Sequence, residues 1–155
     1  MALLPAPGWS NLPACSTLRA MAGKLSPRAQ AKLATLKAAT DKVHHVHGLV
    51  ERYAAVRDPQ QAQQLNQPLK RAFRQLKVDL LVEGLDTMSE LAGSMEIAAG
   101  RGGSRRQKIR ILREGVGSLR FQIEQAQRNV VAEDEAEAER EKREAERQAE
   151  QKEDD

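Results

Sequence analysis

The most regular feature of this chain is a set of apolar residues between positions 109 and 130 that recur at alternating steps of three and four. This spacing places them on one face of an α-helix, as in the seam of an antiparallel bundle or a coiled coil. Two earlier stretches, residues 27–57 and 68–95, carry similar stripes. The three stripes are Ile109, Leu112, Val116, Leu119, Ile123, Ala126 and Val130; Leu33, Leu36, Thr40, Val43, Val46, Val50 and Tyr53; and Leu69, Phe73, Leu76, Leu80, Gly84, Leu91 and Met95. We therefore predict an all-α fold, an antiparallel helical bundle of three to four long helices.

The composition favours the same fold class. The 155 residues include one Trp, one Tyr and two Phe, which is few for a β-sandwich or barrel, and good helix formers dominate. The single cysteine, Cys15, excludes an internal disulfide and a Cys-rich zinc site. No apolar run approaches the roughly 20 residues that cross a bilayer. We expect a soluble, cytoplasmic protein that does not associate with membranes.

Three regions differ in pattern. Residues 1–25 contain three prolines and no periodicity, so we predict a disordered leader; translation from Met21 is an alternative explanation of this segment. Residues 26–131 form the predicted helical bundle. Residues 132–155 have no side chain larger than Ala to bury, and we expect them to form a frayed, solvated helix without tertiary contacts.

Helix boundaries are predicted from capping residues. Ser26 and Pro27 are typical of a helix start, and this first helix should end near Arg57, where Asp58-Pro59 breaks and restarts the chain. The Gln-rich stretch 60–67 is a connector or a short polar helix. Pro68 then opens a second helix that continues to Gly100. Ser104 is the predicted N-cap of a third helix.

Two features predict close packing. The later half of the second helix is apolar on more than one side, which places it at the centre of the bundle or in a subunit interface. The extra apolar residues are Val78, Leu81, Val82, Leu85, Met88 and Ile97. Gly115 and Gly117 lie inside the third helix, where each costs about 1 kcal/mol relative to Ala. Close approach of another helix would explain both glycines.

Charge is unevenly distributed. Residues 1–131 hold 20 Lys/Arg and 10 Asp/Glu, a net +10, whereas residues 132–155 hold 5 and 12, a net −7. A basic body with an acidic tail indicates either a polyanion-binding surface with a competing segment or a solvated body with a solubilising tail. In the first case the tail tunes binding by competing for the same cations.

The turn and helix start at residues 100–113 are the best candidate site. Arg101, Arg105, Arg106 and Lys108 crowd the positive end of a helix dipole, which is unfavourable unless an anion binds there. The spacing is not that of a Walker motif, so nucleotide hydrolysis is not implied. The alternative is an exposed basic turn with no ligand.

Two basic stripes extend this candidate surface. One stripe, on the third helix, consists of Arg106, Arg110, Arg113 and Arg120. The other, on the second helix, consists of Lys70, Arg71, Arg74 and Lys77. Together with the turn they give the predicted nucleic-acid-binding residues: Arg101, Arg105, Arg106, Lys108, Arg110, Arg113, Arg120, Lys70, Arg71, Arg74 and Lys77. Such stripes follow phosphates without reading bases, and the few aromatics argue against a single-strand reader built on stacking.

Catalytic chemistry is not indicated. His44 and His47 lie one helical turn apart, but the sequence supplies no third metal ligand at a telling spacing, so we predict no metal site. Cys15 and the serines lack partners for nucleophilic catalysis, and no carboxylate pair stands out. We expect neither enzymatic activity nor a cofactor.

Residues 91–128 resemble a family of small four-helix bundles. The similar features are a small-residue run ending in Gly100, a basic Gly/Ser turn, and Gly117-Ser118-Leu119 followed by Phe121 and Ile123. The family comprises proteins encoded in ribosomal-RNA intervening sequences and the accessory variability proteins of diversity-generating retroelements.

The two branches of that family differ at two positions of this stretch. Ala99 and Phe121 stand where the intervening-sequence branch places Glu, so the chain looks more like the retroelement branch. That resemblance implies a basic ring, a pentamer, that binds a reverse transcriptase and its RNA or DNA. The family's last apolar helix has no counterpart after Val131. Either residues 27–57 take its place or three helices are completed by oligomerisation.

Two functional hypotheses follow. The first is a non-catalytic, oligomeric nucleic-acid-binding accessory protein that contacts the RNA or DNA backbone and assists a reverse transcriptase or a similar partner. The second is a helical protein-interaction adaptor or chaperone that binds no nucleic acid. Salt sensitivity and charge reversal at Arg105 and Arg106 discriminate between them, because only the first depends on phosphate contacts.

Overall fold

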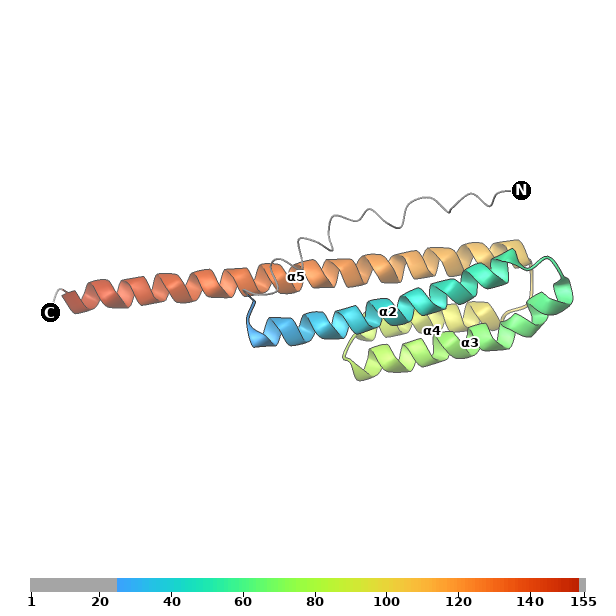
Figure 1. Cartoon of the computed structure of the whole chain (residues 1–155), viewed down its shortest axis with the longest axis horizontal. Helices are drawn as coiled ribbons and strands as arrows, with labels where there is room; N and C mark the ends of the chain where they lie inside the picture. The colour runs from blue at the N-terminus through green and yellow to red at the C-terminus, as the bar shows by residue number, and fades with distance from the viewer. Residues whose placement is uncertain (1–24, 154–155) are drawn as a thin grey trace, which may run out of the picture. The chain divides into compact units, whose positions relative to one another are not determined.

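The computed structural model describes residues 25–153, and the leader predicted for residues 1–25 falls almost wholly outside this range. The described residues form four helices, α2 (Pro27–Ala55), α3 (Pro59–Val82), α4 (Asp86–Gly100) and α5 (Arg105–Glu153) (Figure 1). The prediction of an all-α helical bundle is confirmed. Residues 32–130 form one compact unit, to which all four helices contribute, and a second unit includes residues 25–31 and 131–153.

The start of α2 and its apolar stripe agree with the sequence. The Ser26 hydroxyl oxygen accepts a hydrogen bond from the Ala29 N–H at 3.2 Å, as expected of an N-cap. Thr40 is the exception in the stripe. It is exposed and its hydroxyl donates to the Leu36 carbonyl, while Ala39 takes the buried position. The hydroxyl therefore bonds within its own helix instead of being buried in the bundle.

The Gln-rich stretch is neither a connector nor a separate short helix but the first part of α3. Asp58 is the N-cap and accepts from the Gln60 N–H at 3.0 Å, so the predicted break at Asp58-Pro59 is confirmed. Pro68 lies inside the helix instead of opening it. A proline there removes one backbone hydrogen bond, and its ring crowds the carbonyl of the preceding turn. Burial of Ala62 and Leu69 on either side holds the helix together across it.

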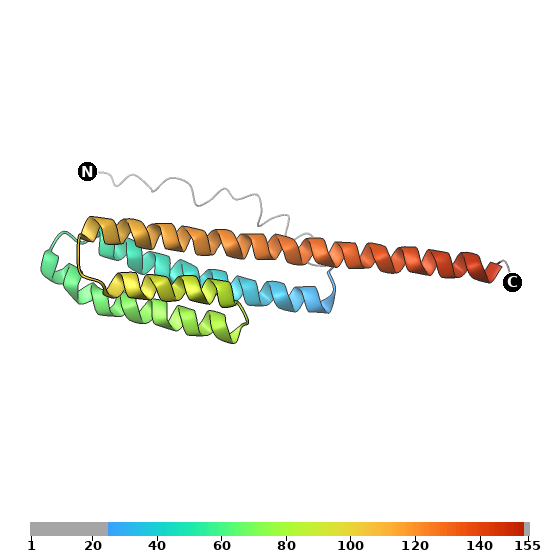
Figure 2. The ribbon, with the colours of Figure 1, turned by 180° about the vertical axis from the view of Figure 1, so that it is seen from behind.

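The predicted second helix is a hairpin of two helices. Gly84 has φ +74°, and the Gly84 and Leu85 N–H groups donate to the carbonyls of Leu81 and Leu80, the pattern of a Schellman C-cap. The chain reverses at this point and α4 packs against α3 (Figure 2). Placing Gly84 in a continuous apolar stripe was therefore wrong.

This reversal separates the extra apolar residues. Met88 is buried and Leu85 packs against the core, but the other four are exposed: Val78, Leu81, Val82 and Ile97. The bundle centre is thus excluded as their location within this chain.

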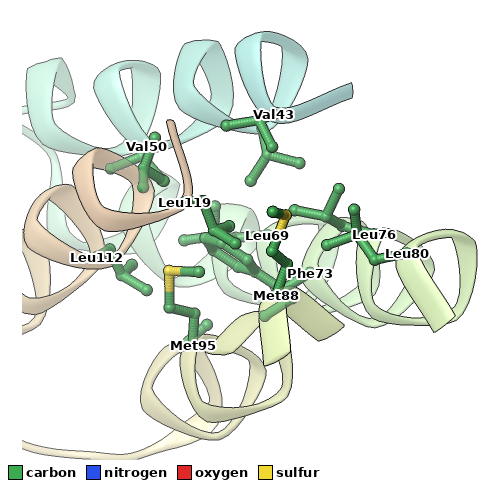
Figure 3. Packing of buried hydrophobic residues seen from close by; sticks show 14 of the residues in the cluster. Val43, Val50, Leu69, Phe73, Leu76, Leu80, Met88, Met95, Leu112 and Leu119 are labelled. Carbon is green, nitrogen blue, oxygen red and sulfur yellow. The ribbon is translucent and has the colours of Figure 1, made fainter. Parts of the chain in front are cut away.

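The bundle core contains side chains from all four helices. Val43 and Val50 of α2 face Phe73 of α3, Met95 of α4 and Leu119 of α5, with other apolar side chains filling the space between them (Figure 3). In α5 the predicted seam is confirmed, because Leu112, Val116, Leu119 and Ile123 are buried and the outer members Ile109, Ala126 and Val130 pack against them. The first helix thus completes a four-helix bundle in one chain.

The two glycines of α5 behave differently. A Cβ on Gly115 would overlap the Met95 sulfur and lie 2.7 Å from its Cγ, so the predicted close approach is confirmed there. At Gly117 no described atom lies within 4 Å of such a Cβ. The prediction is wrong for Gly117 within the described part of the chain.

The acidic segment is helical to Glu153 and mostly exposed, but its first turn does have a tertiary contact. The Asp134 carboxylate accepts hydrogen bonds from the Ser26 N–H, at 3.0 Å, and from the Ser26 hydroxyl. These bonds lower the pKa of Asp134. The expectation of no tertiary contacts is therefore wrong at Asp134, because the N–H and the hydroxyl of Ser26 donate hydrogen bonds to it. None of the described helices combines the length and apolarity needed to span a membrane.

Candidate anion-binding site

The first part of α3, the end of α4, the α4–α5 turn and the start of α5 line a hollow of about 680 Å³ at one end of the bundle. Four cationic residues line it, namely Lys70, Arg101, Arg105 and Lys108, and none of the described residues lining it is acidic. Amide side chains and a tyrosine complete the lining: Gln63, Asn66, Gln67 and Tyr53. The hollow forms where the turn of residues 101–104 was predicted to hold an anion.

Gly100 and Ser104 shape this turn as predicted. α4 ends at Gly100, and Arg101 takes the C-cap position with its N–H donating to the Ile97 carbonyl at 3.1 Å. Gly103 has φ +122°, which favours glycine over any residue with a side chain. The Ser104 hydroxyl lies 3.5 Å from the Gln107 N–H that it caps. The first amides of α5 thus begin beside the hollow.

The Arg105 side chain binds backbone carbonyls at the C-terminal end of α2. Its guanidinium donates to the carbonyls of Tyr53, at 2.5 Å, and Val56, and it lies 5.3 Å from the centre of the Tyr53 ring. A cation at a helix C-terminus binds carbonyls that lack partners and complements the helix dipole. Its Nε is buried and has no hydrogen-bond partner among the described residues. Arg105 therefore joins α5 to α2, a structural role that the sequence did not reveal.

Lys108 binds the C-terminal end of α4, as Arg105 binds that of α2. Its ammonium donates to the Ala99 carbonyl at 3.1 Å and lies 3.5 Å from the Asn66 side-chain oxygen. Burial lowers its pKa. The carbonyl of Ala99 is one of the last in α4, where a cation is favoured. Lys108 thus contributes positive charge to the wall of the hollow while it holds the end of α4.

Arg101 and Arg106 are the available cations of the turn. Both are exposed, and no described residue forms a side-chain hydrogen bond or ion pair with either of them. Lys70 lines the hollow from α3, and its ammonium likewise has no such partner within residues 25–153. These three side chains can bind an anion without giving up an existing contact.

Most of the predicted α3 stripe lies across α4. A Cβ on Gly100 would lie 3.4 Å from Lys70 Cδ, and one on Gly93 would lie 3.3 Å from Lys77 Cδ, so both lysine stems pack over glycines. Between them Arg74 forms an ion pair with Glu96 at 2.8 Å. Arg71 is exposed and unpaired among the described residues. It is the member of the stripe that is most available to a ligand.

The predicted α5 stripe is also partly engaged. Arg113 donates to both carboxylate oxygens of Glu51 at 2.8 Å, which lowers the pKa of Glu51 and raises that of Arg113. Arg110 lies 3.7 Å from Glu114 in an exposed pair. Arg120 is half-buried and lies near His47, whose pKa is lowered mainly by burial and also by this arginine. These three cations are less available than those of the turn.

Charge is segregated within the compact unit. Residues 79–96, which include the α3–α4 turn, hold five acidic residues and no cation, whereas residues 97–113 hold six cations and no acid. Arg57 in the α2–α3 loop adds an exposed cation at the end with the hollow. Sequence reasoning did not single out Arg57, although its place after the first predicted helix could have done so.

No metal centre accompanies this site in the described chain. Within residues 25–153 no three His, Cys, Asp or Glu side chains gather to hold an ion. His44 and His45 are exposed, and His47 is half-buried.

Comparisons of the chain with protein-family models, curated proteins and solved structures gave no match.

Proposed function

We propose that this protein is a non-catalytic nucleic-acid-binding accessory protein whose basic hollow holds backbone phosphates. The observation that carries the proposal is the hollow itself, with four cations and no acidic side chain among its described lining. Arg105 and Lys108 supply fixed positive charge, while Lys70, Arg101 and Arg106 remain available for direct contacts. Guanidinium and ammonium groups bind phosphate through charge-assisted hydrogen bonds.

A polyanion fits better than a single small anion. Arg57 and Arg71 are exposed cations outside the hollow, so the positive surface extends beyond the space that one phosphate fills. Binding through phosphates carries little base information. Tyr53 is only 3% exposed and its ring contacts the Arg105 guanidinium, so it is not free to stack on bases. We expect low sequence specificity for either RNA or DNA.

The partner follows from the resemblance of residues 91–128 to retroelement accessory proteins. It supports a reverse transcriptase, or another enzyme acting on RNA or DNA, as the protein that this chain assists, and a homo-oligomer as the assembled form. Copurification of such an enzyme from the native host with the tagged full chain would test this part of the proposal.

Charge reversal tests the phosphate contact. Arg106→Glu alters one of the two unpaired cations of the turn, and Lys37→Glu makes the same charge change on the exposed side of α2. In 50 mM salt, the affinity of the full chain for a labelled 20-nucleotide RNA or DNA should fall about tenfold in the first variant, the effect of one lost charged contact, and less than about twofold in the second. Fluorescence anisotropy measures both. Absence of binding by the unaltered chain, or equal losses in the two variants, would contradict the proposal.

A second candidate function rests on a different surface. Val78, Leu81 and Val82 are 48%, 55% and 81% exposed and share one side of α3 at helical spacing. If this chain is an adaptor or chaperone, a partner helix binds to this surface, and that binding is insensitive to salt. Leu81→Lys should abolish such binding and leave nucleic-acid affinity unchanged, which separates the two functions.

A further inference from the structure

Gly117 has no structural explanation within residues 25–153, the part of the chain that the structure describes. It lies inside a continuous helix, where glycine is destabilising relative to alanine. Its φ is not positive, and no described atom lies within 4 Å of where a Cβ would be. Gly115, two residues earlier, is explained by Met95, so the two glycines need different causes. A remaining reason for a helical glycine is close approach of a backbone from another molecule.

The residues on the same side of α5 as Gly117 are typical of a surface that packs against another helix. Phe121, one turn further, is 61% exposed, although burial of a phenylalanine is strongly favourable. The two residues belong to a stripe that recurs at steps of four and three on the side of α5 opposite its buried seam. We name it the α5 outer stripe; it consists of Arg110, Glu114, Gly117, Phe121, Glu124 and Arg128.

Two charged residues of the α5 outer stripe, Arg110 and Glu124, are complementary to the same residues of a second copy. Arg110 lies 3.7 Å from Glu114 and Arg128 lies 3.9 Å from Glu124, so the stripe has no net charge although residues 1–131 carry +10. If two copies cross in antiparallel orientation at Gly117, the residue seven positions after it faces the residue seven positions before it. Glu124 then faces Arg110 of the other copy, twice per pair. A parallel pair would instead place like charges together.

We propose that the α5 outer stripe is a self-association surface at which two chains cross in antiparallel orientation on Gly117. Gly117 lets the two backbones approach, and Phe121 covers the opposing helix beside the crossing point. The Glu124 and Arg110 side chains form ion pairs between the copies on either side. This assigns Arg110 to a protein contact instead of the phosphate site, and it does not depend on nucleic-acid binding.

Sedimentation equilibrium of the full chain tests this surface. Between about 1 and 200 μM, the range that a modest interface requires, the mass should rise from 17.2 kDa toward twice that value. Gly117→Ala and Phe121→Ala should each weaken the dimer at least about tenfold, as central contacts do. Ile97→Ala, at an exposed apolar residue of α4, is the matched control and should change the dissociation constant less than about twofold.

Gly117→Ala also separates association from folding. Alanine raises helix propensity, so the melting temperature of the dilute monomer should increase while the dimer weakens. A variant that merely failed to fold would show a lower melting temperature instead. If the unaltered chain is a monomer throughout, or if neither substitution changes its association, the proposal is overturned.

Orientation is tested by a charge swap and by cross-linking. Arg110→Glu should weaken the dimer, and Arg110→Glu combined with Glu124→Arg should restore it. In a Cys15→Ser background, Gly117→Cys should form a disulfide with its own copy, because only residues at the crossing point come within about 7 Å. Val78→Cys should not. A closed assembly larger than a dimer, or no rescue by the swap, would contradict the two-fold arrangement.

Discussion

Four cations lie in the α4–α5 turn and the start of α5, and four lie along one side of α3, yet the bundle uses the two sets differently. At the turn, Arg105 and Lys108 bind backbone carbonyls of α2 and α4, and Arg101 and Arg106 stay unpaired within the described chain. On α3, the Lys70 and Lys77 stems pack over glycines of α4 and Arg74 pairs with Glu96. Three of the four cations at the turn line the hollow, whereas on α3 only Lys70 does so.

This difference shows that the number of cations on a helix face does not define a phosphate-binding surface. A guanidinium that already donates to carbonyls, or pairs with a carboxylate, must give up that contact to bind a new anion. An unpaired one gives up only water. Neighbours in sequence can therefore have opposite roles, as Arg105 and Arg106 do.

Arg105 and Arg106 give the largest expected contrast in stability. Arg105→Gln should lower the free energy of unfolding by about 2–3 kcal/mol, because it removes charged hydrogen bonds to the end of α2. Arg106→Gln should change it by less than about 0.5 kcal/mol. Urea denaturation followed by circular dichroism measures both. Equal losses of stability would remove the distinction between structural and available cations at the turn.

Arg74 and Arg71 make the same comparison on α3. Arg74→Gln breaks the ion pair with Glu96 and should reduce stability by up to about 1 kcal/mol while nucleic-acid affinity stays within about twofold. Arg71→Gln should leave stability unchanged and weaken binding about threefold, as the loss of one exposed phosphate contact. Anisotropy and urea denaturation on the same preparations check both; a larger loss of affinity for Arg74→Gln would contradict this assignment.

The acidic tail, residues 132–155, tests whether negative side chains of the same chain compete with nucleic acid for the unpaired cations. If it competes for the unpaired cations, replacing Glu141, Glu144, Glu146 and Glu150 by Gln should tighten binding by about threefold at 50 mM salt. At 300 mM salt the difference should vanish, because exposed charges are then screened. Unchanged affinity at low salt would show that the tail does not compete.

The Glu51 carboxylate provides the smallest effect, a pH dependence. Its hydrogen bonds with Arg113 lower its pKa, so this stabilisation is complete above the ordinary value of 4.5 and is lost as the pH falls through the lowered value. Arg113→Leu should reduce stability at pH 6 and make the stability profile below pH 4.5 flatter. Urea midpoints between pH 3 and 6 measure this, and an unaltered profile would contradict it.

Much of the fold follows from local pattern. The steps of three and four in α2 and α5, the Ser26 and Asp58 caps and the end at Gly100 could be read from the residues, because each depends on near neighbours in sequence. Gly84 was missed because it fits the apolar spacing on both sides of the reversal. Leu85 and Asp86 after it are compatible with a Schellman cap and a new first turn, which could have indicated the hairpin.

The candidate site could be only partly predicted. The basic turn was found because its residues are consecutive, but the partners of its cations come from distant parts of the chain. Val56 lies 49 residues before Arg105, and Glu51 lies 62 residues before Arg113. Such contacts depend on how the helices pack, which no local pattern specifies.

The salt dependence of nucleic-acid binding tests the central claim most directly. Two unpaired cations, Lys70 and Arg101, line the hollow, and two more, Arg71 and Arg106, directly follow lining residues in the sequence. Each phosphate contact contributes about −0.7 to −0.9 to the slope of log affinity against log salt. The account predicts a slope of about −3 for the unaltered chain and a slope smaller by about 1 for Arg106→Gln. A slope near zero, or one that Arg106→Gln leaves unchanged, would contradict phosphate binding at this end of the bundle.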